Sequence, residues 1–212
     1  MIDIQPAIAL MERDEANLRA TAMDGECRAE IYRFASRSVT AGRNAKVSDA
    51  DVARWGEQGH AFARRPTGGG ILRHDGDISF GFTFPIRENE GDPSCGPHLR
   101  RVSAAIAAAL LRQGIETHPA SAGSAAAPSH CFQRAVGCEL MRNGRKLLGL
   151  AARRIRGAVL VQGSLTVARD ETWDRAIIGV GPEIDLEGTG FQEDLFEGAL
   201  LELLRETKPV FV

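Results

Sequence analysis

The chain has 212 residues, 43% of them hydrophobic and 25% charged, and a formal net charge of −2 at pH 7. This length fits one domain with a sizeable core, so we expect residues 1–212 to form a single domain. The balanced charge argues against a nucleic-acid-binding protein, and no apolar run reaches the roughly 20 residues that span a bilayer. The N-terminus has no basic stretch leading into an apolar core, so we expect a cytoplasmic protein with no membrane partner.

The first half of the chain alternates helical and extended patterns. Apolar residues at helical spacing favour a helix, and alternation of apolar and polar residues favours a strand. The segment Ser-Asp-Ala-Asp at 48–51 resembles a helix N-cap. The expected elements in chain order are a helix over 11–23, a strand over 30–39, a helix over 52–59, an extended segment over 61–65, a loop over 66–70 and a strand over 78–85.

The second half is also mixed, and its most regular pattern is helical. The expected elements are a helix over 97–113, a loop over 121–129, three strands over 138–143, 144–155 and 158–167, and a helix over 191–206. Asn143 and Gly144 form the expected hairpin turn between the first two of these strands. Because helices and strands mix without a regular βαβ rhythm, the chain is predicted to be α+β, with a central mixed, largely antiparallel sheet flanked by helices.

A glycine-rich loop is the first candidate functional feature. Gly68–Gly70 follow Arg64, Arg65, a proline and a threonine. Glycines let the backbone approach a ligand closely, and consecutive N–H groups can hold an anion or a carboxylate. The sequence does not match the nucleotide-binding patterns G-x-x-x-x-G-K-[ST] or G-x-G-x-x-G. The alternative interpretation is a plain turn, in which His74 and Asp75 are ordinary loop residues.

A lysine in an apolar segment is the second feature. The chain has only three lysines, and Lys146 stands among small and apolar residues. In a regular strand Lys146 would share a face with Leu148, and Leu147 would share the other face with Gly149. A lysine just after a turn is usually solvated. The competing interpretation is a point charge held in a cleft, where it binds a carbonyl, carboxylate or phosphate, with Gly149 leaving room for a bound chain.

The cysteines show no paired spacing. Cys27, Cys95, Cys131 and Cys138 include no Cys-x-x-Cys pair, so neither a zinc site nor a redox motif is indicated. The default interpretation for each is a small buried hydrophobic residue.

Taken together, the two candidate features resemble the biotin/lipoate ligase and octanoyltransferase family. The segments that carry the resemblance are DEANL at 14–18, RRPTGGGILRHD at 64–75, GRKLLGLAARR at 144–154 and LVQGSL at 160–165. Their order and spacing agree with the family over roughly residues 30–170. The resemblance implies an α+β fold of the biotin/lipoate ligase type and a tunnel for an activated acyl chain, within one lipoate- or octanoate-attachment catalytic domain spanning the chain.

The resemblance also assigns site residues. The acyl-binding set that it implies is Arg64, Thr67, Gly68, Gly69, Gly70, His74, Gly149, Gly163 and Ser164. Lys146 would contact the acyl carbonyl or carboxylate, and Gln162 stands where many relatives have histidine. We expect the tunnel to be apolar and lined partly by Phe80 or Phe82 and by Leu148 or Leu150.

The favoured activity is acyl transfer through a cysteine. His130-Cys131-Phe132, followed by Glu139-Leu140 and GRKLLG, is similar to the cysteine transferases of the family. Cys131 would carry an octanoyl or lipoyl group from an acyl carrier protein or lipoyl-domain donor to a lysine of a lipoyl-domain acceptor protein, with no added cofactor. Against this assignment, those transferases often carry TGGR in the loop, whereas this chain has Gly70.

Two alternatives remain open at the level of sequence. An ATP-dependent lipoate–protein ligase would use Arg64, the glycine loop and Lys146 to hold an acyl-adenylate, with ATP and Mg²⁺ required. A non-catalytic relative would keep the acyl- or carrier-binding pocket without turnover, since fold and pocket do not guarantee chemistry. No protein metal ligands are expected in any of the three cases.

Overall fold

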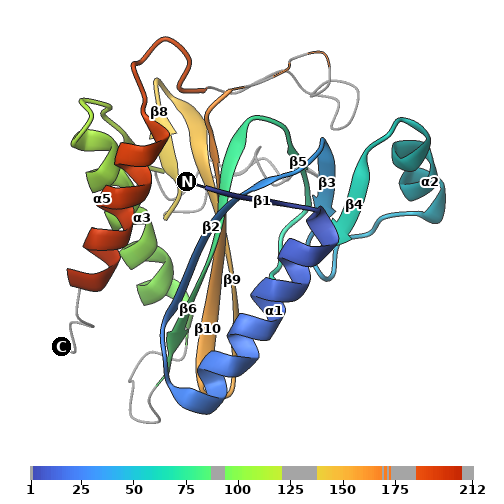
Figure 1. Cartoon of the computed structure of the whole chain (residues 1–212), viewed down its shortest axis with the longest axis horizontal. Helices are drawn as coiled ribbons and strands as arrows, with labels where there is room; N and C mark the ends of the chain where they lie inside the picture. The colour runs from blue at the N-terminus through green and yellow to red at the C-terminus, as the bar shows by residue number, and fades with distance from the viewer. Residues whose placement is uncertain are drawn as a thin grey trace.

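The computed structural model describes residues 2–86, 94–120, 138–168, 170, 172 and 185–206. Its strands form two sheets, and the larger one has seven strands in the order β1-β2-β6-β10-β9-β8-β7 (Figure 1). These are β1 Asp3–Gln5, β2 Arg28–Phe34, β6 Asp77–Pro85, β7 His118–Pro119, β8 Leu140–Arg142, β9 Arg145–Ile155 and β10 Ala158–Thr166. Among these strands β1 and β2 are the one parallel pair, so the predicted mixed, largely antiparallel sheet is confirmed.

The smaller sheet carries the glycine loop. Its three strands, in the order β4-β3-β5, are β3 Ser38–Ala41, β4 Ala61–Arg64 and β5 Ile71–His74. The connection from β4 to β5 contains Gly68–Gly70. Because β3 pairs with both β4 and β5, it fixes the two ends of this loop relative to each other.

Helices cover both faces of the larger sheet. The described helices are α1 Ala7–Asp24, α2 Asp49–Glu57, α3 Gly96–Leu111 and α5 Glu193–Glu206. α3 and α5 lie side by side on one face, where Phe80, Phe82 and Val161 of the sheet join Ile106 and Phe196 of the helices in the main core (Figure 1). α1 packs on the other face, between β6 and β10 of the larger sheet and β4 of the smaller one. None of the described helices has the length and apolar character that a membrane crossing requires.

Several element boundaries differ from the expectations. The strand expected over 30–39 is wrong as a single element, because β2 ends at Phe34 and β3 begins at Ser38 in the other sheet. α1 begins four residues before the expected start at residue 11, directly after Pro6. The turn at Asn143 and Gly144 is confirmed, with φ of 51° and 73°, and β8, β9 and β10 form the expected antiparallel meander. The expected loop over 121–129 lies outside the described residues.

Candidate acyl-binding site

A pocket lies between the two sheets. The residues that line it are Met11, Tyr32, Phe34, Arg65, Leu72, His74, Ser79, Glu139, Lys146, Gly149, Leu150, Ala151, Gln162, Gly163 and Ser164. Its exposed wall is mostly apolar. The small residues Gly149 and Ala151 of β9 line the pocket and leave room there for a bound chain, whereas a side chain at Gly163 of β10 would meet Phe80 in the core.

A β-bulge turns Lys146 into this pocket. Leu140 of β8 pairs with Leu148 of β9, but the next residue, Met141, pairs with Lys146, so Leu147 is an extra residue in β9. A bulge of this kind changes the direction of the side chains that follow it. Leu147 and Leu148 both join the core, whereas Lys146 lines the pocket. The expectation from regular alternation, that Lys146 and Leu148 share a face, is therefore wrong.

Lys146 forms a buried ion pair. Its Nζ lies 2.6 Å from Oε1 of Glu139, and the two side chains are 3% and 7% exposed. Desolvating an ammonium is costly unless an opposite charge accompanies it, so Glu139 makes the inward position of Lys146 tolerable. The pair places one fixed cation and one fixed anion at the same end of the pocket.

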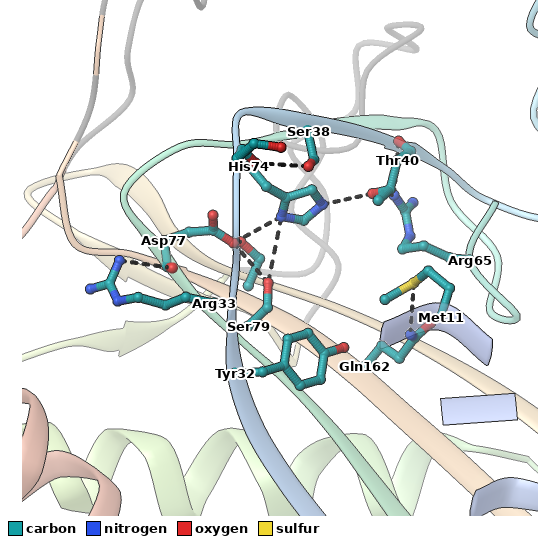
Figure 2. A network of polar contacts seen from close by, with 12 residues as sticks. Met11, Tyr32, Arg33, Ser38, Thr40, Arg65, His74, Asp77, Ser79 and Gln162 are labelled. Carbon is teal, nitrogen blue, oxygen red and sulfur yellow. Dashed lines mark hydrogen bonds and ion pairs between the residues drawn. The ribbon is translucent and has the colours of Figure 1, made fainter. Parts of the chain in front are cut away.

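Asp77 organises the polar wall of the pocket (Figure 2). Its Oδ2 accepts hydrogen bonds from Ser79 Oγ and Ser164 Oγ, each at 2.7 Å, and lies 2.9 Å from His74 Nδ1. Burial acts to raise the pKa of Asp77, but the adjacent His74 imidazole and the two serine hydroxyls outweigh it and hold this pKa below its usual range. Because the three neighbours direct their protons toward one carboxylate, their donors do not face the pocket.

A second buried carboxylate, Asp14 of α1, accepts hydrogen bonds from Tyr32 and Gln162, which also line the pocket. Tyr32 Oη donates to its Oδ2 at 2.7 Å, and Gln162 Nε2 donates to the same atom at 2.6 Å. Gln162 Oε1 in turn accepts a 2.6 Å hydrogen bond from Thr67 Oγ1, which ties the glycine loop to α1. Burial raises the pKa of Asp14 to about 6, against the lowering effect of the bonds from Tyr32 and Gln162. Gln162 is thus a structural bridge here.

Arg65 holds the glycine loop from within the pocket. Its Nη2 donates to the Gly70 carbonyl at 2.9 Å and to the Gly68 carbonyl at 3.4 Å. Its Nη1 donates to Thr40 Oγ1 at 2.7 Å and to the Thr40 carbonyl at 3.1 Å. The buried guanidinium therefore fixes the loop by its carbonyl oxygens.

The structure brings many of the expected residues together. Lys146, His74, Gly149, Gly163 and Ser164 all line the pocket. Thr67 is buried behind the pocket and donates a hydrogen bond to Gln162, which lines it. Gly68 and Gly70 are linked to the pocket by Arg65, which lines it and donates to their carbonyl oxygens.

Other expected residues lie elsewhere. Arg64 is exposed, donates to the Ala45 carbonyl at 3.0 Å, and lines a separate open groove beside α1. Leu150 lines the pocket as expected, but Phe80 and Phe82 lie in the core on the other face of the sheet. Cys131 lies outside the described residues. No group of three or more His, Cys, Asp or Glu side chains that could hold a metal ion occurs in the part of the chain described.

Four residues of the site were not among the site residues assigned from the sequence, although Asp14, Arg65 and Glu139 stand within the segments that carry the resemblance. They are Asp14, Arg65, Asp77 and Glu139. Alternation continued one residue past β4 could have distinguished the two arginines, since Ala63 and Arg65 are buried and Arg64 between them is exposed. The carboxylates gave no comparable signal, because Asp and Glu are almost always solvated.

Comparison with known proteins places these features in a family. Octanoyltransferase LipM of Kyrpidia tusciae is 31% identical over 133 residues, which are 58% of this chain and 47% of that protein. The chain spans about half the length of the curated relatives it matches. A crystal structure of lipoate-protein ligase A bound with ATP superposes with a TM-score of 0.77 at 22% identity, covering 97% of this chain and 83% of that one.

A second solved structure supports the same fold. The bi-partite lipoate protein ligase of Thermoplasma acidophilum, described with its E2 lipoyl domain, has a TM-score of 0.66 at 18% identity and covers 97% of this chain and 82% of that one. At such low identities these superpositions establish the fold alone. The sequence match to the lipoyl protein ligase A/B catalytic domain extends over residues 7–188, most of the chain, and the chain therefore belongs to that family.

Proposed function

We propose that this chain is an enzyme that transfers an octanoyl or lipoyl group from a carrier protein to a lysine of a lipoyl-domain acceptor protein. The observation that carries the proposal is the buried Lys146 ammonium, which lines a mostly apolar pocket walled by Gly149, Ala151 and Gly163. A medium acyl chain gains about 0.8 kcal/mol for each buried CH₂, so such a wall can supply much of the binding free energy. The ammonium can then hold the carbonyl end of the chain.

The proposed chemistry runs through Cys131. Its thiolate attacks the thioester carbonyl of the acylated carrier, the carrier thiolate leaves, and the acyl group is held as an enzyme thioester. Lys146 stabilises the negative charge that develops on the carbonyl oxygen. The neutral amine of the acceptor lysine then attacks, the C–S bond breaks, and the amide forms as the amine's proton passes to the leaving Cys131 sulfur. No ATP is consumed, because the thioester already activates the acyl group.

The charges in the pocket favour this route over an ATP-dependent ligase. Within the described residues, the arginine and lysine that line the pocket are Arg65 and Lys146. Arg65 donates to backbone carbonyls of its own loop, Lys146 is paired with Glu139, and Glu139 adds a negative charge to the same wall. A triphosphate would meet this carboxylate, whereas a thioester carries no charge. ATP-dependent lipoate attachment remains the second candidate function.

The test is acyl labelling without ATP. Incubation with octanoyl-carrier protein should add one octanoyl mass to the protein, and hydroxylamine should remove it because it cleaves thioesters and spares amides. Cys131→Ser should abolish rapid labelling, since serine has no thiolate character at neutral pH. Cys95→Ser and Cys138→Ser are matched controls that should label normally.

Other outcomes identify the alternatives. Full activity of Cys131→Ser with a strict ATP requirement, together with ATP–pyrophosphate exchange, would reject the transferase and establish the ligase. Binding of the acyl carrier without labelling or exchange would establish a non-catalytic binding protein. Addition of the purified lipoyl domain then asks whether the label moves to an acceptor lysine.

A further inference from the structure

A continuous chain of hydrogen bonds joins Asp77 to the glycine loop. From Asp77 Oδ2 it passes to His74 Nδ1 at 2.9 Å, and His74 Nε2 lies 2.7 Å from Thr40 Oγ1 (Figure 2). Thr40 Oγ1 also accepts from Arg65 Nη1 at 2.7 Å, and Arg65 Nη2 reaches the Gly70 carbonyl at 2.9 Å. All four side chains are buried, and the chain of hydrogen bonds runs from the larger sheet to the smaller one.

The donors and acceptors in this chain can be assigned by counting protons. A guanidinium can only donate, so Arg65 uses Thr40 Oγ1 as an acceptor. The single hydroxyl proton of Thr40 then needs an acceptor, and His74 Nε2 is 2.7 Å away. With Nε2 accepting, the proton of a neutral His74 is on Nδ1, where it is donated to the Asp77 carboxylate. In this arrangement each contact of the chain has one donor and one acceptor.

We propose that Thr40 and Asp77 are positioning residues, which together fix His74 as the neutral, Nδ1-protonated tautomer and hold the glycine loop through Arg65. His74 lines the pocket, and its ring stacks on Phe34 with centroids 3.9 Å apart. Both ring nitrogens contact buried side chains that do not line the pocket, so in this proposal His74 serves as a fixed part of the wall. Any displacement of that wall by a bound chain is passed to the loop through Thr40 and Arg65.

Thr40 is the informative position for a test. It is fully buried and does not line the pocket, so a change there acts only through its neighbours. Thr40→Val keeps the shape and removes the hydroxyl, and Thr40→Ser keeps the hydroxyl. If the hydroxyl is what matters, the serine variant should behave as the wild type while the valine variant does not.

The first measurement is ¹⁵N NMR of the histidine rings in the wild-type protein. The His74 signals are identified among those of the five histidines by their loss in His74→Gln. At pH 7 we expect a protonated Nδ1 and an unprotonated Nε2. A doubly protonated ring, or a proton on Nε2, would overturn the proposal whether or not the protein transfers acyl groups.

The second measurement is kinetic and rests on the proposed function. Thr40→Val should lower kcat/KM for the octanoyl donor by roughly 10- to 100-fold, mainly through KM, as expected when a binding loop shifts by a fraction of an ångström. Thr40→Ser should restore it to within about twofold. Equal loss in both variants, or none in Thr40→Val, would contradict the positioning role. If the wild-type protein transfers no octanoyl group, the proposed function is refuted, and the NMR measurement alone decides whether Thr40 and Asp77 position His74.

Discussion

Lys146 depends on a neighbouring carboxylate and on one extra residue in its strand. Without the bulge at Leu147, its side chain would point with Leu148 into the core. Without Glu139, it would be a buried ammonium lacking the carboxylate that lies 2.6 Å from Nζ. Together, the bulge and Glu139 hold the compact ammonium of Lys146 at a fixed position in the pocket wall. That requirement is specific to lysine, because arginine is longer and planar.

Replacement of Lys146 by arginine should therefore remove most activity although it keeps the charge. The guanidinium cannot occupy the position of Nζ beside Glu139 without displacing the wall, and loss of one oriented donor typically lowers the rate by about 100- to 1,000-fold. The measurement is the rate of octanoyl transfer at saturating donor. Lys46→Arg is the matched control, since Lys46 is exposed and lies outside the pocket. Retention of more than a third of the rate in Lys146→Arg would contradict the proposed role.

The residues predicted from sequence were those with unusual composition or spacing. Lys146 stood out because lysine is rare in this chain, and the glycines because three are consecutive. Asp14, Asp77 and Glu139 did not stand out, because a carboxylate in a charged helix or a turn has the same local pattern whether it is buried or solvated. Only the partners that approach from distant segments, such as Gln162 at Asp14, distinguish the two cases.

At the level of the elements, apolar residues recurring every two or 3.6 residues predicted which segments form strands and helices. They predicted less well how those strands pair and how the helices pack. The residues of 30–39 do alternate, and both β2 and β3 lie within or next to them. Alternation does not indicate which partner a strand pairs with. It therefore could not predict that the chain leaves the larger sheet after Phe34 and enters the smaller one. The Asn-Gly turn was predictable because its backbone conformation depends on those two residues alone.

Backbone conformation gives opposite predictions for two glycines, Gly144 in the hairpin turn and Gly198 in α5. Gly144 has φ of 73° and open space around its Cα, so Gly144→Ala should lower the free energy of unfolding by about 1–2 kcal/mol through backbone strain alone. Gly198 lies within α5 and also faces open space, so Gly198→Ala should raise it by about 1 kcal/mol. Urea denaturation of the two variants measures both. Changes of the same sign would show that packing, rather than backbone conformation, decides these positions.

Across the whole molecule, two buried carboxylates brace the space between the sheets in different ways. Asp77 receives three hydrogen-bonding neighbours on one oxygen, and its pKa is held below the usual range. Asp14 has its Oδ1 buried without a hydrogen-bond partner against Gly81, where an added Cβ would lie 2.2 Å from that oxygen. Its pKa is raised to about 6 by burial. The two groups should therefore change the stability of the fold with pH in opposite directions.

Asp14→Asn isolates one of these contributions. Because burial raises the pKa of Asp14 from its ordinary value of 3.8, which applies in the unfolded chain, to about 6 in the folded chain, its contribution to stability is complete below pH 4 and is lost as pH rises through 6. That loss, on the order of 3 kcal/mol from the pKa difference, is absent in the variant, because an amide does not titrate. The amide oxygen can still accept from Tyr32 and Gln162, and the unpartnered amide nitrogen costs the same at every pH.

The expected result is a difference in unfolding free energy between Asp14→Asn and the wild type that shifts in favour of the variant between pH 4.5 and pH 8, measured by urea denaturation. Asp77→Asn is the opposing control. The lowered pKa of Asp77 gives stability that is present above pH 4 and lost as pH falls, so this variant should be less stable than the wild type at pH 7 and less sensitive to acid. A pH-independent difference for Asp14→Asn would mean that water reaches this carboxylate and that the pocket wall beside Gln162 is open to solvent.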